Sequence, residues 1–232
     1  MYNLVNVFKD LSTDKNINTE SNTGVDLFKG SDENGVELEK YLKSGFVKEG
    51  FKFVSLNDLG TRAYDVNKLL KAGKKRQVKQ IFKNYCLLYG VDHIFTSLDS
   101  FPPDFIIFTN NEIHLIEAKS TKRDSIRYGD NLPKPDIIYV LRDRKNKIQT
   151  FYYGEDILEN YEKMMDVITK VDNIKNTVLK PLIKEMKELS GGLFAPSFRR
   201  SIGSTLGGKE TMPSLSPLRL KRENKVLEMV GK

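Results

Sequence analysis

Five short apolar runs in the middle of the chain constrain its fold more than any other feature. Turn-forming residues divide these runs, and the pair Asn110-Asn111 suits a hairpin turn between the second and the third. Runs of this length with such boundaries predict four or five β-strands. The runs span residues 92–96, 104–109, 112–119, 136–141 and 148–153.

Segments with helical periodicity lie on both sides of these runs. Before them, residues 63–89 place Val78, Phe82 and other apolar side chains on one face, and Gly90 then ends the pattern. After them, a helical pattern returns over residues 155–189, with an interruption near Pro181. Helices, then strands, then helices again predict an α/β fold with a mixed central β-sheet flanked by helices.

The ends of the chain differ in composition from its middle. Residues 1–33 are polar and rich in turn formers, whereas the chain after Gly191-Gly192 is basic and rich in Ser, Gly and Pro. We therefore expect an N-terminal helical and loop region over 1–62 that packs on the core, a core over 63–190, and a basic C-terminal arm with a short helix over 191–232.

Charge and cysteine content narrow the classes of function. The 38 Lys and Arg against 31 Asp and Glu give a net charge of +7, which suits a polyanionic partner such as nucleic acid. Cys86 is the only cysteine, which excludes a disulfide framework and a thiolate zinc site. The sequence has neither a signal peptide pattern nor the roughly 20 apolar residues of a membrane span. We expect a soluble cytoplasmic protein without a membrane partner.

Asp104, Glu117 and Lys119 stand out because they interrupt or border the apolar runs. Asp104 opens one run, while Glu117 and Lys119 lie at the end of the next. Side chains alternate along a strand, so Glu117 and Lys119 share a face. If the two runs pair through the Asn110-Asn111 turn, Asp104 lies near Glu117.

Such a group has a definite chemical use. Two carboxylates can hold Mg²⁺ and leave sites for water and a phosphate oxygen, and the backbone carbonyl of Ala118 can add a ligand. An adjacent ammonium group, here Lys119, positions the attacking water or stabilises developing charge. We therefore assign catalysis to Asp104, Glu117 and Lys119, and metal binding to Asp104, Glu117 and Ala118.

A purely structural role for these charges is the alternative. An acid followed two residues later by Lys also occurs at Asp143, Glu185 and Glu223. Those copies fall in a turn, a helix and the basic tail, where solvated side chains are expected. Only Glu117 and Lys119 interrupt a strongly apolar strand, where an unpaired charge is costly. A buried ion pair remains the competing interpretation.

Pro103-Asp104 followed by Glu117-Ala118-Lys119 resembles the motif of the PD-(D/E)XK nuclease superfamily. The resemblance covers about residues 73–155, and the segment 128–141 is similar to type II restriction endonucleases. It implies a restriction-endonuclease-like core and Mg²⁺-dependent hydrolysis of phosphodiesters. It further implies a homodimer that cleaves double-stranded DNA at specific sites, since two identical centres suit a symmetric site.

Further residues are candidates for support of this centre. Many members of the superfamily add an acid from a helix before the motif, and here Glu37 is chosen over Glu39, both in the predicted helix 35–44. His93 is expected to be a partly buried strand residue, and His114 to face away from Glu117. The candidates for DNA contact are Ser120, Lys122, Asn131, Lys134, Arg199 and Arg200.

Two other functions are compatible with the same residues. One is a repair or recombination nuclease on the same core. The other is a non-catalytic nucleic-acid-binding protein, in which the two acids and the lysine merely form a buried salt bridge.

Overall fold

The structure is a computed structural model that divides into two compact units, each treated by itself below. The first unit contains residues 1–126, 134–157 and 206–232, and the second contains 127–133 and 158–205. Within these spans the described residues are 4–13, 36–98, 102–123, 125–128, 132–157, 160–191, 205–207 and 212–231.

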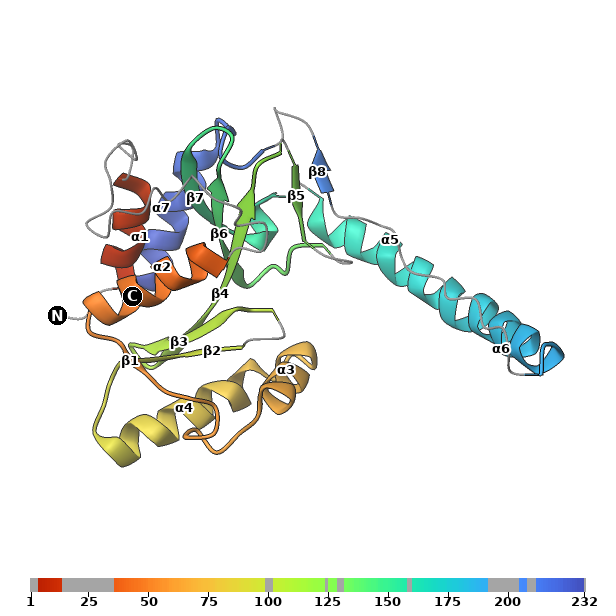
Figure 1. Cartoon of the computed structure of the whole chain (residues 1–232), viewed down its shortest axis with the longest axis horizontal. Helices are drawn as coiled ribbons and strands as arrows, with labels where there is room; N and C mark the ends of the chain where they lie inside the picture. Colours follow the sequence, from red (N-terminus) through yellow and green to blue (C-terminus); the bar gives the residue numbers. More distant parts are fainter. Residues whose placement is uncertain are drawn as a thin grey trace. The chain divides into compact units, whose positions relative to one another are not determined.

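A six-stranded mixed sheet forms the centre of the first unit (Figure 1). Its strand order is β1-β2-β3-β4-β6-β7, with β1–β2 and β4–β6 parallel and the other neighbours antiparallel. This confirms the predicted α/β fold with a mixed central sheet. The strands are β1 (Lys52–Phe53), β2 (Ile94–Ser97), β3 (Phe105–Thr109), β4 (Glu112–Thr121), β6 (Ile137–Asp143) and β7 (Ile148–Tyr153).

Helices cover both faces of this sheet. Helices α1 (Leu4–Thr13), α2 (Val36–Lys48) and α7 (Arg219–Val230) pack their apolar side chains against Ala118 and Val140 in one core. Figure 1 shows α3 (Ala63–Lys71) and α4 (Lys75–Tyr89) on the other side. There the α4 ring of Phe82 stacks on Phe108 at 6.4 Å between centroids. Ala118 and Glu117 alternate along β4, so Glu117 faces the side of α3 and α4.

The division into units differs from the one expected from composition. The C-terminal helix α7 belongs to the first unit, because it buries Val226 and Val230 in the same core as α1 and α2. Residues 158–189, expected in the core, belong to the second unit. Helices are present in both places, as the sequence pattern predicted.

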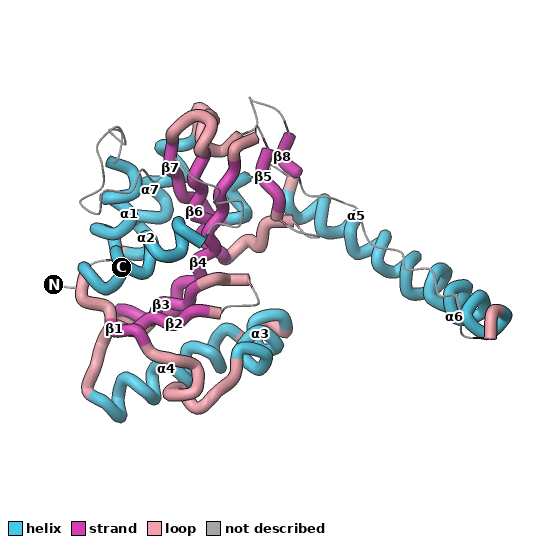
Figure 2. The backbone as a smooth tube through the Cα atoms, viewed as in Figure 1, coloured by secondary structure: helices cyan, strands magenta, loops and turns pink. Residues whose placement is uncertain are grey.

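The second unit is built on one long helical rod (Figure 2). Helix α5 (Tyr161–Ile174) continues through the π-helical segment η2 (Lys175–Leu179) into α6 (Lys180–Leu189). The predicted interruption near Pro181 is therefore a local change of winding, since proline in the first turn of α6 lacks an N–H to donate backward.

Two smaller elements complete the described chain. A 3₁₀ turn, η1 (Gly154–Ile157), follows β7, and β5 (Ser125–Arg127) pairs with β8 (Thr205–Gly207). Among the helices that the structure describes, none combines the length and apolar character needed to cross a bilayer.

Candidate active site

Asp104, Glu117 and Lys119 meet where β3 begins. The pairing of β3 with β4 starts at Phe105, which lies opposite Ile116, so Asp104 is the first residue beyond it. The Ala118 N–H donates a hydrogen bond of 2.6 Å to Asp104 Oδ2, and Lys119 Nζ donates one of 2.5 Å to Glu117 Oε1. The structure thus brings together the three residues that the sequence singled out.

The two carboxylates of this group carry more negative charge than Lys119 neutralises. Burial and, after it, the nearby charge of Glu117 raise the pKa of Asp104 to about 7, although the Ala118 N–H and Lys119 oppose the shift. Glu117 is 6% exposed, and its Oε2 atom is buried without a hydrogen-bond partner. A buried carboxylate oxygen without a donor is costly, so this position favours a cation.

The residues at this position fit a hard divalent cation. Glu117 Oε2 and the Asp104 carboxylate offer oxygen ligands, which Mg²⁺ prefers. The N–H and C=O of a strand residue point to the same edge, so the Ala118 carbonyl lies on the side of Asp104. No group of three His, Cys, Asp or Glu side chains converges within the described part of the chain. Water and phosphate oxygens would therefore complete the shell, as is usual for Mg²⁺.

Among the acids of helix α2, Glu39 rather than Glu37 has a charge that acts on Asp104. The charge of Glu39 contributes to the raised pKa of Asp104 after burial and Glu117, whereas Glu37 does not enter. Leu38, Leu42 and Phe46 form the buried stripe of α2, and the two glutamates lie on opposite flanks of it. The sequence shows this apolar stripe, but only the packing of α2 decides whether the flank of Glu37 or that of Glu39 lies nearer Asp104.

Neighbouring contacts agree with this orientation of α2. Lys43, one turn beyond Glu39, places its Nζ 5.8 Å from the ring centroid of Phe105, the residue after Asp104. Glu37 has a buried carboxylate oxygen, Oε2, without a hydrogen-bond partner. The assignment of Glu37 as the helical acid stays a prediction, and Glu39 is the acid of α2 whose charge acts on Asp104.

Lys134 is held on the same face as Glu117. Tyr139 lies opposite Glu117 in the parallel pair β4–β6, and its hydroxyl accepts a 2.9 Å hydrogen bond from the Lys134 N–H. Burial and the charge of Lys71 lower the pKa of Lys134, while Asp136 and Glu117 oppose that shift. Lys134 thus lies within electrostatic range of the carboxylates.

Gly154 packs closely against the backbone of Lys134 and the ring of Tyr139. A Cβ atom at Gly154 would lie 2.0 Å from the Lys134 carbonyl oxygen and 3.0 Å from Cε2 of Tyr139. Only a residue without a side chain permits this approach of two backbone segments. The sequence offered no signal for it, since Gly154 resembles any other turn glycine.

The remaining candidates have less connection to the site. Ser120 alternates with Lys119 and so lies on the opposite face of β4, and Lys122 is exposed beyond the strand end. His114 faces away from Glu117 as expected, and burial lowers its pKa to about 4. His93 makes a 2.7 Å hydrogen bond with Thr109 Oγ1. Asn131, Arg199 and Arg200 lie outside the described residues.

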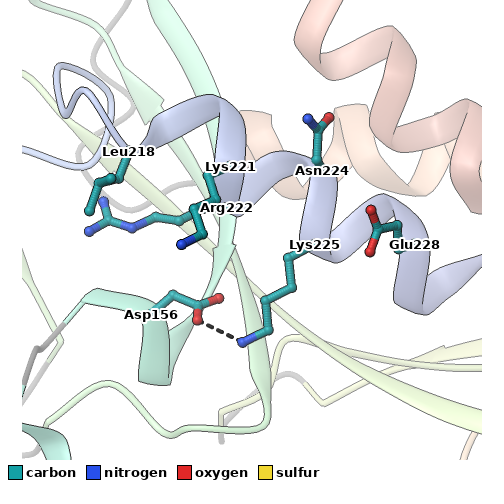
Figure 3. Close-up of a pocket in the computed structure, with 7 residues that line it drawn as sticks. All are labelled: Asp156, Leu218, Lys221, Arg222, Asn224, Lys225 and Glu228. Atoms are coloured by element: carbon teal, nitrogen blue, oxygen red, sulfur yellow. Dashed lines mark hydrogen bonds and ion pairs between the residues drawn. The ribbon is translucent and has the colours of Figure 1, made fainter.

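A separate hollow of about 690 Å³ lies along α7 (Figure 3). Lys221 and Arg222 line it, and Lys225 there donates hydrogen bonds of 2.7 Å to Asp156 and 2.8 Å to Glu155. Helix α7 covers the Ala118 face of the sheet, so this hollow does not belong to the Glu117 site.

Comparison with protein-family models, with curated proteins and with solved structures gives no match to this chain. The chemistry of the site itself is therefore the basis for a function. The relevant features are the two carboxylates, Lys119 and the neighbouring Lys134.

The raised pKa of Asp104 predicts an unusual pH dependence of stability. The folded pKa of about 7 exceeds the ordinary value of 3.8, so without metal the folded state gains stability as pH falls from about 7 toward 4. Above pH 7 the charged form opposes folding. In EDTA above pH 7, the free energy of unfolding of Asp104→Asn should therefore exceed that of the wild type by about 1 kcal/mol or more.

Urea unfolding at pH 4, 6 and 8 measures this difference. We expect the advantage of Asp104→Asn to vanish at pH 4, and Mg²⁺ to stabilise the wild type but not the variant at pH 8. If the free energy of unfolding depends on pH in the same way for both proteins, the raised pKa of Asp104 would be contradicted.

Proposed function

We propose that this chain is a Mg²⁺-dependent endonuclease that cleaves double-stranded DNA at specific sites, on a restriction-endonuclease-like core. The observation that carries the proposal is the pair of insufficiently neutralised carboxylates, Asp104 and Glu117, beside Lys119. A structural ion pair needs one acid for one base, and this site has an acid in excess.

The residues of the chain would divide the chemistry as follows. Asp104, Glu117 and the Ala118 carbonyl would hold Mg²⁺, which when bound polarises the phosphate and lowers the pKa of the attacking water. Lys119 exchanges its hydrogen bond with Glu117 for one to that water or to a phosphate oxygen. Its ammonium group then stabilises the negative charge that develops on the phosphate.

Lysines around the site suit the phosphate backbone of DNA. Lys134 lies within electrostatic range of Glu117, and Lys71 is close enough to affect Lys134. Lys75, at the start of α4, is paired with Asp136 at 3.6 Å. Together with the net charge of +7, these cations favour a polyanion that spans the site. Ser120, Lys122, Asn131, Arg199 and Arg200 remain predicted contacts, and the homodimer remains a proposal.

The competing functions make different demands on the site. A non-catalytic nucleic-acid-binding protein would need Glu117 and Lys119 only as a salt bridge, which leaves the cost of Asp104 beside Glu117 unexplained. A repair or recombination nuclease would use the same residues, so it differs only in the DNA that it cuts.

Digestion of phage DNA with Mg²⁺, and with EDTA as a control, tests the proposal. Discrete fragments that depend on Mg²⁺ are the expected result. A smear or shortened ends would instead support the repair or recombination nuclease. Lack of any cleavage on unmethylated DNA, together with salt-sensitive binding, would leave the non-catalytic binding protein and overturn the enzyme assignment.

A further inference from the structure

The helical rod of the second unit carries an apolar stripe along its whole length. Six of its side chains are exposed: Met164 is 38% exposed, Ile174 56%, Val178 49%, Leu182 51%, Met186 43% and Leu189 82%. Single exposed apolar residues are common on protein surfaces, but a continuous stripe marks an interaction surface. Ile168, which is 8% exposed, and the half-buried Val171 lie in line with these six residues, and the eight together form the stripe.

The winding of the rod keeps this stripe on one face. Its members follow one another in steps of three or four residues, including three consecutive steps of four from Ile174 to Met186. In a regular α-helix each step of four turns the face by about 40°. The π turns of η2 take more residues per turn and offset part of that drift. The π-helical segment η2 therefore helps to keep the apolar residues of the stripe on one face.

Charge along the rod indicates what covers the stripe. In the half that precedes η2, Glu162, Asp166 and Asp172 outnumber Lys163 and Lys170, so the half is net negative. The other half, η2 and α6, is net positive. Its lysines are Lys175, Lys180, Lys184 and Lys187, and its acids are Glu185 and Glu188.

A rod with opposite charge on its two halves is complementary to itself in the antiparallel direction. In an antiparallel pair, the negative half of each rod lies against the positive half of the other. In a parallel pair, halves of like charge would lie together. Two-fold symmetry generates such a pair, because the same surface is used on both copies. At 1.5 Å per residue the rod is about 40 Å long.

We propose that two copies of this chain associate through the α5–α6 stripe as an antiparallel pair of helices. This inference does not rest on the proposed function, since neither Asp104 nor Glu117 takes part in it. If both hold, the pair supplies the two-fold relation that the cutting of two DNA strands requires.

Sedimentation of the full chain over a range of concentrations tests the proposal. We expect a dimer of the wild type at micromolar concentration, and a monomer for Val178→Asp and Leu182→Asp, with loss of at least tenfold in affinity. Asn173→Asp is the matched control, because it adds the same charge on the polar side of the rod and should leave the dimer intact. Circular dichroism establishes that each variant remains folded.

Other occupants of the stripe give other results. A wild type that is monomeric at all concentrations, with residues 161–189 protected from hydrogen exchange, would mean that the same chain covers the stripe and would overturn the proposal. A dimer that both aspartate variants retain would overturn it as well. Neither result depends on whether the protein cleaves DNA.

Discussion

Lys119→Ala is expected to reduce DNA cleavage by about 10² to 10⁴-fold, the range for loss of a group that positions or transfers a proton. Lys119 Nζ lies 2.5 Å from Glu117 Oε1, and its charge also acts on Asp104. Its loss leaves Glu117 buried without its donor, so the developing charge on the phosphate meets a more negative site. Initial rates on a plasmid at saturating Mg²⁺ measure the effect.

The chain offers a matched control for this substitution. Lys145 is the lysine of another acid-x-Lys triplet and is exposed in the turn after β6, so Lys145→Ala should cleave at the wild-type rate. DNA binding in EDTA by Lys119→Ala should remain within a few-fold of the wild type. Wild-type cleavage by Lys119→Ala, with its fold intact, would contradict the assigned role.

Gly154→Ala should clearly destabilise the first unit. The added Cβ would lie 2.0 Å from the carbonyl oxygen of Lys134, and backbone cannot move aside as the end of a flexible side chain can. We expect a loss of about 1–3 kcal/mol or more, as for other overpacked sites. Since Lys134 must shift, cleavage should fall as well.

Gly45→Ala is the control for Gly154→Ala. A Cβ at Gly45 would meet only Val7 Cγ1 at 3.4 Å, an ordinary contact, and alanine favours the helix. This variant should therefore be as stable as the wild type or more so. Thermal unfolding compares the two, with about 2–4 °C expected per kcal/mol for a chain of this size. Equal unfolding temperatures for Gly154→Ala and the wild type would rule out the close approach.

Local patterns in the sequence determined the strands and the relation of Glu117 to Lys119. Alternation along β4 sets both side chains on one face, and the Asn110-Asn111 hairpin brings Asp104 beside Ala118, because a short turn leaves little choice of register. The apolar stripe of α5–α6 is likewise visible in the sequence as steps of three and four. These are properties of neighbouring residues, which a sequence records directly.

The tertiary structure alone decided which distant segments complete the site. It brought the charge of Glu39 within reach of Asp104 and joined the Lys134 N–H to the Tyr139 hydroxyl by a hydrogen bond. It also brought Gly154 against the Lys134 carbonyl. Each depends on how a helix or a loop packs on the sheet, and many residues share the energy of that packing. The cluster of Asp104, Glu117 and Lys119 could therefore be predicted from the sequence, whereas its burial, its excess charge and its supporting residues could not.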